Sequence, residues 1–225
     1  MGGAAFQAII FDLDGVLIDS EPLYLRTINE VLREEKVGPM MSGVNHEFIG
    51  APADLTWGAL RARFGLPQPA LYYQERYYGL LEGVLRRELR IRPDAARLLK
   101  EVARRGTRRA LATSSRRRWT DLKLHLLGLE GYFGATVCRE DVAQPKPAPD
   151  VYLRAGEMAG IAMAEAIAVE DSPTGIAAAK AAGLYTVALR TGSTDGMDLG
   201  EADRVIESLD GFDWRLLDGR AVHAD

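Results

Sequence analysis

Cysteine is almost absent from this chain: its 225 residues include a single one, Cys138. No intramolecular disulfide can form, which excludes the disulfide-stapled secreted domains and favours a reducing, cytoplasmic compartment. We interpret the thiol as a small buried apolar group rather than a reactive one. The sequence also lacks any apolar run near the ~18 residues that cross a bilayer, and residues 1–7 lack the pattern of a secretory signal. We expect neither a membrane-spanning nor an exported protein.

Positive charge is not in excess either. The chain has 28 Lys and Arg against 32 Asp and Glu, a formal net charge of −4, which argues against a protein dedicated to nucleic acid. Hydrophobic residues make up 47% and charged residues 27%, which excludes disordered and fibrous classes. We expect that the partner of this protein is neither nucleic acid nor membrane, and we expect a monomer or weak dimer.

Short apolar runs bounded by charged or turn residues predict five buried parallel strands. The runs are Ala8–Phe11, Arg109–Ala112, Ala135–Cys138, Ala166–Val169 and Tyr185–Leu189. Segments of helical period lie between the later runs, at Pro93–Arg105, Arg116–Leu127, Asp150–Ala159 and Pro173–Ala182. This alternation predicts an α/β fold with a doubly wound parallel sheet.

One interruption breaks the alternation, because about 97 residues separate the end of the first run from the start of the second. That stretch is mostly helical in pattern, with candidate helices at Pro22–Glu35, Ala53–Phe64 and Pro69–Leu89. We predict a catalytic core formed by residues 1–19 and 91–225, and a small all-α cap domain inserted at residues 20–90.

Two carboxylates, Asp12 and Asp14, follow the first predicted strand directly. Side chains two residues apart point to the same side of an extended chain, so their charges repel unless a cation lies between them or one is protonated. The pair thus indicates a divalent metal site or an acid/base pair. A simple turn before Gly15 is the alternative interpretation.

A second acidic pair, Glu170 and Asp171, follows another predicted strand, and Ser172-Pro173 is a typical helix start. In open α/β sheets, ligands bind at the carboxyl ends of the strands, so four carboxylates converge on one edge. Favourable placement of an acid near a helix N-terminus explains one of these residues but not both pairs.

Two further segments reach the same region. Thr113, Ser114 and Ser115 end a strand and could seat an anion or simply cap a helix. Lys146, one of five lysines against 23 arginines, is held between prolines and could serve phosphate or carboxylate, or lie in a surface loop. Four acids and one lysine sum to −3, so an anion would need a hard cation such as Mg²⁺ beside it. This suits phosphoryl transfer with one carboxylate as nucleophile and another as acid and base.

Four sequence segments carry these candidate residues in order: Asp12-Leu13-Asp14-Gly15-Val16-Leu17, Thr113, Lys146 before Pro147, and Glu170-Asp171-Ser172 followed by Gly175. Their order and spacing resemble the four motifs of the haloacid dehalogenase superfamily, and the resemblance spans Ala8–Leu189. The insert resembles the helical cap of the β-phosphoglucomutase-like and sugar-phosphatase branch. The resemblance implies a Rossmann-like core and a Mg²⁺-dependent phosphomonoester hydrolase that acts through an aspartyl-phosphate on a small phosphorylated metabolite, with a sugar phosphate as the expected substrate.

Site roles follow from the resemblance position by position. It implies Asp12 as nucleophile, Asp14 as general acid/base, and Thr113, Ser114 and Lys146 as phosphate contacts. Asp12, Asp171 and the backbone carbonyl of Asp14 would hold the magnesium ion, with Glu170 as a helper on the metal side. An acid at position 14 also argues against the dehalogenases of the superfamily.

One position in the predicted cap bears on the choice between a phosphatase and a mutase. β-Phosphoglucomutases carry a histidine where this chain has Tyr24, so a phosphatase is favoured over a hexose phosphomutase, and a catalytically lapsed binding protein is the least favoured alternative. Candidate substrate contacts are Glu21 and Tyr24, followed by Arg61 and residues 45–50, which include His46. Four tyrosines at helical spacing are expected to build the core or rim of the cap: Tyr72, Tyr73, Tyr77 and Tyr78.

Overall fold

The computed structural model describes residues 5–40 and 53–218. The chain forms two compact units, one made of Met1–Ile18 with Ile91–Asp225 and the other of Asp19–Arg90. Within the larger unit, Ile18 bridges Ile91 in antiparallel fashion, and the Arg92 amide donates to the Leu17 carbonyl at 2.9 Å. The two chain segments that connect to the smaller unit are therefore held side by side.

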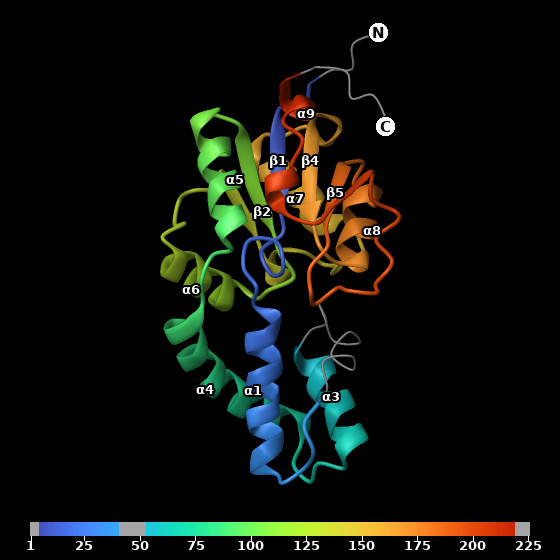
Figure 1. Ribbon diagram of the computed structural model, residues 1–225. Helices are drawn as coiled ribbons and strands as arrows, with labels where there is room; N and C mark the ends of the chain where they lie inside the picture. The colour runs from blue at the N-terminus through green and yellow to red at the C-terminus, as the bar shows by residue number, and fades with distance from the viewer. Residues whose placement is uncertain (1–4, 41–52, 219–225) are drawn as a thin grey trace. The chain divides into compact units, whose positions relative to one another are not determined.

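A six-stranded sheet forms the centre of the larger unit (Figure 1). Its strands are β1 (Ala8–Phe11), β2 (Arg108–Ala112), β3 (Ala135–Val137), β4 (Ala166–Glu170), β5 (Tyr185–Leu189) and β6 (Arg204–Ile206). The order is β3-β2-β1-β4-β5-β6, and every neighbouring pair is parallel. The predicted doubly wound α/β fold is confirmed. Its central strands β1 and β4 are buried along their whole length, as their continuous apolar runs require.

Strand β6 was not among the five predicted strands. It has only three residues, lies at the sheet edge and exposes Val205, so it lacks the apolar run that marked the others.

Helices α5 (Pro93–Arg104), α6 (Arg117–Leu127), α7 (Asp150–Ala159) and α8 (Pro173–Ala181) connect the strands, and a short α9 spans Arg215–Asp218. Their bounds agree with the predicted segments to within one residue. Small strand residues such as Ala110 and Ala168 let α7 and α8 pack closely, with Tyr152 and Ala178 in the same buried cluster. Helix α8 begins as expected, with the Ser172 hydroxyl accepting from the Gly175 amide at 3.1 Å and Pro173 in the first turn.

The smaller unit contains α1 (Glu21–Glu34), α3 (Ala53–Phe64) and α4 (Ala70–Glu88), which match the predicted helices to within one residue. Trp57 stacks on Tyr73 with ring centroids 5.8 Å apart and lies 5.9 Å from Tyr77. These rings are buried, which confirms that Tyr73 and Tyr77 build the unit's own core, while Tyr72 is exposed. Residues 45–50, with His46, lie outside the described residues.

No helix in the described part of the chain combines the length and apolarity that crossing a membrane requires.

Candidate active site

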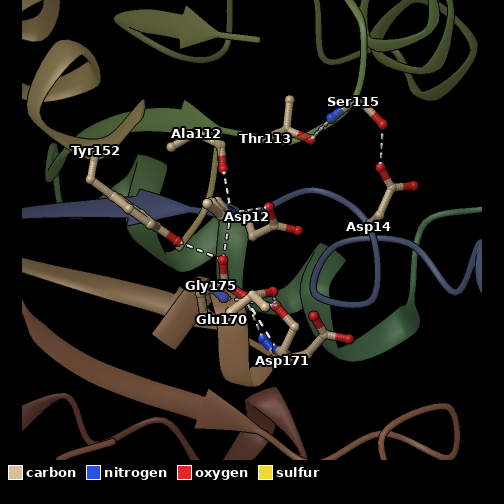
Figure 2. A network of polar contacts seen from close by, with 12 residues as sticks. Asp12, Asp14, Ala112, Thr113, Ser115, Tyr152, Glu170, Asp171 and Gly175 are labelled. Atoms are coloured by element: carbon tan, nitrogen blue, oxygen red, sulfur yellow. Dashed lines mark hydrogen bonds and ion pairs between the residues drawn. The ribbon is translucent and has the colours of Figure 1, made fainter. Parts of the chain in front are cut away.

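Three acidic residues meet where the two central strands end (Figure 2). Asp12 follows β1 directly, Glu170 is the last residue of β4 and Asp171 comes next. Each is buried, and one carboxylate oxygen of each lies within 4.8 Å of those of the other two. β1 and β4 pair in parallel with Phe11 opposite Val169, so the sheet register itself brings these carboxylates together.

The Lys146 ammonium lies among these acids. Nζ donates to Oδ1 of Asp12 at 2.6 Å, to Oε1 of Glu170 at 2.5 Å and to the Ala112 carbonyl at 3.1 Å. Burial would lower the pKa of Lys146, but the two carboxylates raise it above its ordinary value, so the lysine carries a charge. Burial raises the pKa of Asp12 to about 7, the charges of Glu170 and Asp14 add to this rise, and Lys146 opposes it.

Glu170 is fully enclosed by donors. Its Oε1 accepts from Lys146 and from the Tyr152 hydroxyl at 2.8 Å, while Oε2 accepts from the Asp171 amide at 3.0 Å and the Ser172 hydroxyl at 3.2 Å. Both oxygens are thus engaged with the protein. The Glu170 side chain holds the Lys146 ammonium and the backbone of Asp171 in place. It therefore supports the positions of the other two acids.

Two glycines leave the space that the acids fill. Gly15 has φ +85°, a conformation that side chains rarely adopt, and a Cβ there would lie 1.9 Å from Oδ2 of Asp171. A Cβ at Gly175 would lie 1.9 Å from Oε1 of Glu170. The Asp-Gly turn and the first turn of α8 therefore approach the carboxylates more closely than any other residue would allow.

Asp14 belongs to a neighbouring cluster with a different lysine. The Lys123 ammonium of α6 donates to Oδ1 and Oδ2 of Asp14 at 2.7 Å each, and to the Ser115 hydroxyl at 2.9 Å. Ser115 in turn donates to Oδ2 of Asp14 at 2.7 Å, as Figure 2 shows. Asp12 and Asp14 are two residues apart, yet each is held by its own lysine.

Two of the three predicted phosphate contacts, Thr113 and Ser114, follow β2. Thr113 is buried, and its hydroxyl accepts from the Ser115 amide at 3.1 Å, which fixes the turn between β2 and α6. Ser114 is half-buried in that turn. With Lys146, these residues come from the same strand-end region as the acids, because β2 pairs with β1.

The residues present fit a hard divalent cation. Carboxylate oxygens are the ligands that Mg²⁺ prefers, and the cluster of Asp12, Glu170 and Asp171 supplies them at short mutual distance. Four acids and the two lysines Lys123 and Lys146 carry a formal charge of −2, which one divalent cation would cancel. Asp12 and Asp171 are the better placed ligands, since Glu170 is engaged with five donors of the protein.

Sequence reasoning missed Lys123 and Tyr152, and it gave Ser115 as part of an anion seat or helix cap rather than as a partner of Asp14. Scarcity was the only available signal for Lys123, which is one of five lysines. A position inside a helix does not reveal a partner 109 residues earlier in the chain.

Glu21 and Tyr24 lie in α1 of the smaller unit, where Glu21 is buried in the first turn. Their role in substrate binding stays a prediction.

Comparisons with known proteins agree with this geometry. Residues 9–189 match the family described as haloacid dehalogenase-like hydrolase. A phosphorylated carbohydrates phosphatase of Thermotoga maritima is 30% identical over 181 residues, covering 80% of this chain and 83% of the relative. A beta-phosphoglucomutase of Bacillus subtilis is 27% identical, covering 94% of this chain and 93% of the relative. The crystal structure of a CbbY mutant from Rhodobacter sphaeroides, in complex with xylulose-1,5-bisphosphate, superposes with a TM-score of 0.80 at 26% identity, covering 92% of this chain and 96% of that one.

Proposed function

The chain belongs to the haloacid dehalogenase-like hydrolase family and is a phosphatase-type enzyme, and from this we propose that it is a Mg²⁺-dependent phosphomonoester hydrolase that acts on a small phosphorylated sugar. The observation that carries the proposal is the buried cluster of Asp12, Glu170 and Asp171, in which the Lys146 ammonium contacts Asp12 and Glu170. Such a cluster offers a nucleophilic carboxylate, oxygen ligands for a cation and a fixed positive charge for a phosphate within one small volume.

Asp12 is proposed as the nucleophile. One carboxylate oxygen forms a bond to phosphorus while the bond from phosphorus to the ester oxygen breaks, which leaves an aspartyl-phosphate. The contact between Lys146 and Oδ1 of Asp12 fixes the carboxylate before the substrate arrives, and a charged lysine there also attracts the dianion. Thr113 and Ser114 are proposed to bind the phosphoryl oxygens beside Lys146.

Asp14 is proposed as the general acid and base. It gives a proton to the departing ester oxygen, then takes a proton from the water that attacks phosphorus, which releases inorganic phosphate and restores Asp12. Both steps require the Asp14 carboxyl group within hydrogen-bond reach of the reacting oxygen. Its contacts with Ser115 and Lys123 show that the side chain occupies a defined position rather than a solvated one.

Asp12, Asp171 and the backbone carbonyl of Asp14 are proposed to hold Mg²⁺. When bound, the ion supplies positive charge that offsets repulsion between the acids and a phosphate. Glu170 keeps Lys146 and the Asp171 loop in place, which supports the ligand positions from behind.

Sugar phosphates are the proposed substrates. Support comes from two relatives, a phosphorylated carbohydrates phosphatase and a validoxylamine A 7'-phosphate phosphatase, together with the similar structure that holds a sugar bisphosphate. We propose that the inserted unit selects among such esters as a cap domain, with Glu21 and Tyr24 as candidate contacts.

The proposal is tested by measuring inorganic phosphate release from a panel of sugar phosphates, phosphoglycolate and nucleotides, with Mg²⁺ and with chelator. We expect release from one or a few sugar phosphates that requires Mg²⁺. The matched blank is Asp12→Asn, which keeps the size and polarity of the side chain but removes the nucleophile, and it should be inactive.

Each arm can contradict a separate part of the proposal. Undiminished turnover of a pure Asp12→Asn preparation would exclude Asp12 as nucleophile, and equal release in chelator would exclude the metal. If no ester of the panel releases phosphate but the protein converts β-glucose 1-phosphate in the presence of a bisphosphate activator, the protein is a hexose phosphomutase instead. That activity is the one in the name of the beta-phosphoglucomutase relative.

A further inference from the structure

A fully buried lysine, Lys123, contacts Asp14 without being part of any motif identified from the sequence. We propose that Lys123 and Ser115 are positioning residues that orient the Asp14 carboxyl group for proton transfer. This inference rests on the proposed function, because it assigns Lys123 a task only if Asp14 is the acid and base of the reaction.

The contact geometry leaves little freedom for Asp14. Both carboxylate oxygens accept from Nζ of Lys123 at 2.7 Å, and Oδ2 also accepts from the Ser115 hydroxyl at 2.7 Å. Lys123 donates to that same hydroxyl at 2.9 Å, so the three side chains form a closed triangle of hydrogen bonds. A closed triangle fixes the plane of the carboxyl group as well as its position.

Burial of the Lys123 ammonium lowers the stability of the fold unless the charge is paired. Its side chain is 1% exposed, and a charge removed from water requires a partner to compensate for the lost hydration. The Asp14 side chain, in contrast, is 18% exposed and so reaches the accessible part of the site. The lysine thus contacts the carboxyl group from the buried side, while the Asp14 side chain as a whole keeps some exposure to solvent.

A second lysine–aspartate pair shows what an ordinary contact of this type looks like. Lys180 donates to both carboxylate oxygens of Asp203 at 2.7 Å, the same distance, but both side chains are about a third exposed and lie outside the acidic cluster. The pair therefore offers a matched control, since replacing Lys180 removes an equivalent contact that plays no part in the proposed chemistry.

Leaving-group dependence separates positioning from general structural support. Protonation of the departing oxygen matters most for a poor leaving group and least for an activated one. A residue that acts through Asp14 should therefore affect phenyl phosphate more than para-nitrophenyl phosphate, whereas a damaged fold would slow both esters equally.

The experiment measures kcat/KM, which reports formation of the aspartyl-phosphate and not its later hydrolysis, on these two esters. The proteins are wild type, Lys123→Met, Lys123→Arg, Ser115→Ala, Asp14→Asn and the double variant of Lys123→Met with Asp14→Asn. We expect Lys123→Met to lower kcat/KM on phenyl phosphate about 10²-fold, as a misplaced catalytic group does, and to affect para-nitrophenyl phosphate far less. Lys123→Arg should restore part of the loss, and Ser115→Ala should show the same pattern to a smaller extent. Lys180→Met should match wild type on both esters.

The double variant decides whether Lys123 works through Asp14. If it does, Lys123→Met causes no further loss once Asp14 is asparagine. An equal loss on both esters, or a full additional loss in the Asp14→Asn background, would overturn the inference. Should Lys123→Met fail to fold, an unchanged ratio of the two esters in Ser115→Ala and Lys123→Arg would overturn it equally. Failure of the proposed function reads out separately, because Asp14→Asn itself would then show no dependence on the leaving group.

Discussion

At the scale of single residues, the candidate site depends on glycines, which leave room for the acidic side chains. At Gly175, an added Cβ would overlap the Glu170 carboxylate at 1.9 Å. The Glu170 carboxylate cannot move aside without breaking hydrogen bonds, because its two oxygens accept from Lys146, Tyr152 and the loop after β4. Any movement of the carboxylate is therefore transmitted to the lysine that holds Asp12.

We expect Gly175→Ala to lower kcat about 10²-fold or more, since displacement of a catalytic group by an ångström has that effect. The matched control is Gly79→Ala in α4, an exposed helical glycine with open space around its Cβ position. It should leave kcat unchanged and stabilise the protein by about 0.5–1 kcal/mol. Steady-state kinetics and thermal unfolding of both variants check this, and wild-type turnover by Gly175→Ala would show that Glu170 has room to move.

Metal binding is also a property of particular residues and can be measured without turnover. A ligand that binds only the folded state at 100 times its Kd stabilises it by about 2.7 kcal/mol. We expect Mg²⁺ to raise the Tm of the chelator-treated protein, and Asp171→Asn to abolish most of that rise. Asp203→Asn, an acid in the same unit whose partner is Lys180, should keep it. An equal rise in all three proteins would place the ion elsewhere.

Position at a strand end made most of the site predictable from the sequence. Asp12, Thr113, Glu170 and Asp171 follow apolar runs directly, and parallel strands present such residues at one edge of the sheet. Lys123 could not be found in this way. Its place on a helix gives a face but no partner, and the contact depends on how α6 packs after β2 has been placed beside β1.

At the scale of elements, Asp94 connects the start of α5 to the segment after β6. Its carboxylate accepts from the Leu209 amide and the Ser208 hydroxyl at 3.0 Å each, and it pairs with Arg92. Burial would raise the pKa of Asp94, but hydrogen bonds from Arg92, Leu209 and Ser208 outweigh it and lower the pKa below its usual range. The ionised form therefore holds two distant chain segments together.

The sign of the resulting pH dependence follows from the lowered pKa. The stabilisation is fully present above the pKa of an unfolded aspartate, about 3.9, and is lost as pH falls through the lower folded value, because the unfolded state then binds more protons. We expect Asp94→Asn to cost about 2 kcal/mol at neutral pH, typical of a buried hydrogen-bonded carboxylate, and less near pH 3. Urea unfolding across pH 3–7 measures this.

An acid on the same segment provides the control for Asp94. Asp210 pairs with Arg97 on the surface, where both side chains are more than half exposed, so Asp210→Asn should stay close to wild type at every pH. A cost for Asp94→Asn that is constant between pH 3 and 7 would show that shape rather than charge accounts for its contribution.

Elements with strong local signals were predictable to within a residue, and weak ones were not. Helix α7 ends at Gly160 in the left-handed conformation, and α8 starts at Ser172-Pro173, both of which are visible in the sequence. Strand β6 and the short α9 have three and four residues and no such markers. They form because the sheet edge beside β5 and the neighbouring segments give them something to pair with or pack on.

At the scale of the whole molecule, the two units divide the proposed tasks. Every contact among Asp12, Asp14, Lys123, Lys146 and Glu170 lies within the unit that holds the sheet. The inserted unit has a core of its own around Trp57. This division predicts that the chemistry depends on the first unit and the choice of substrate on the second.

Replacing residues 19–90 with a short glycine–serine linker tests that division. Ile18 and Ile91 already pair across an antiparallel bridge, where Cα atoms lie about 5 Å apart, so a linker of about four residues can close the gap. We expect the shortened chain to keep its α/β circular dichroism and a cooperative thermal transition. The same substitution in an Asp12→Asn background provides the blank for activity.

The activity expected of the shortened protein follows from which contacts it keeps. Para-nitrophenyl phosphate should still be hydrolysed above the blank, because Asp12, Lys146 and the Asp14 cluster remain, whereas discrimination among sugar phosphates should be lost together with Glu21 and Tyr24. Phosphate release from the aryl ester and from the sugar panel measures both. A folded protein without activity on the aryl ester would mean that the inserted unit contributes to catalysis itself, and unchanged sugar selectivity would mean that the larger unit recognises the substrate.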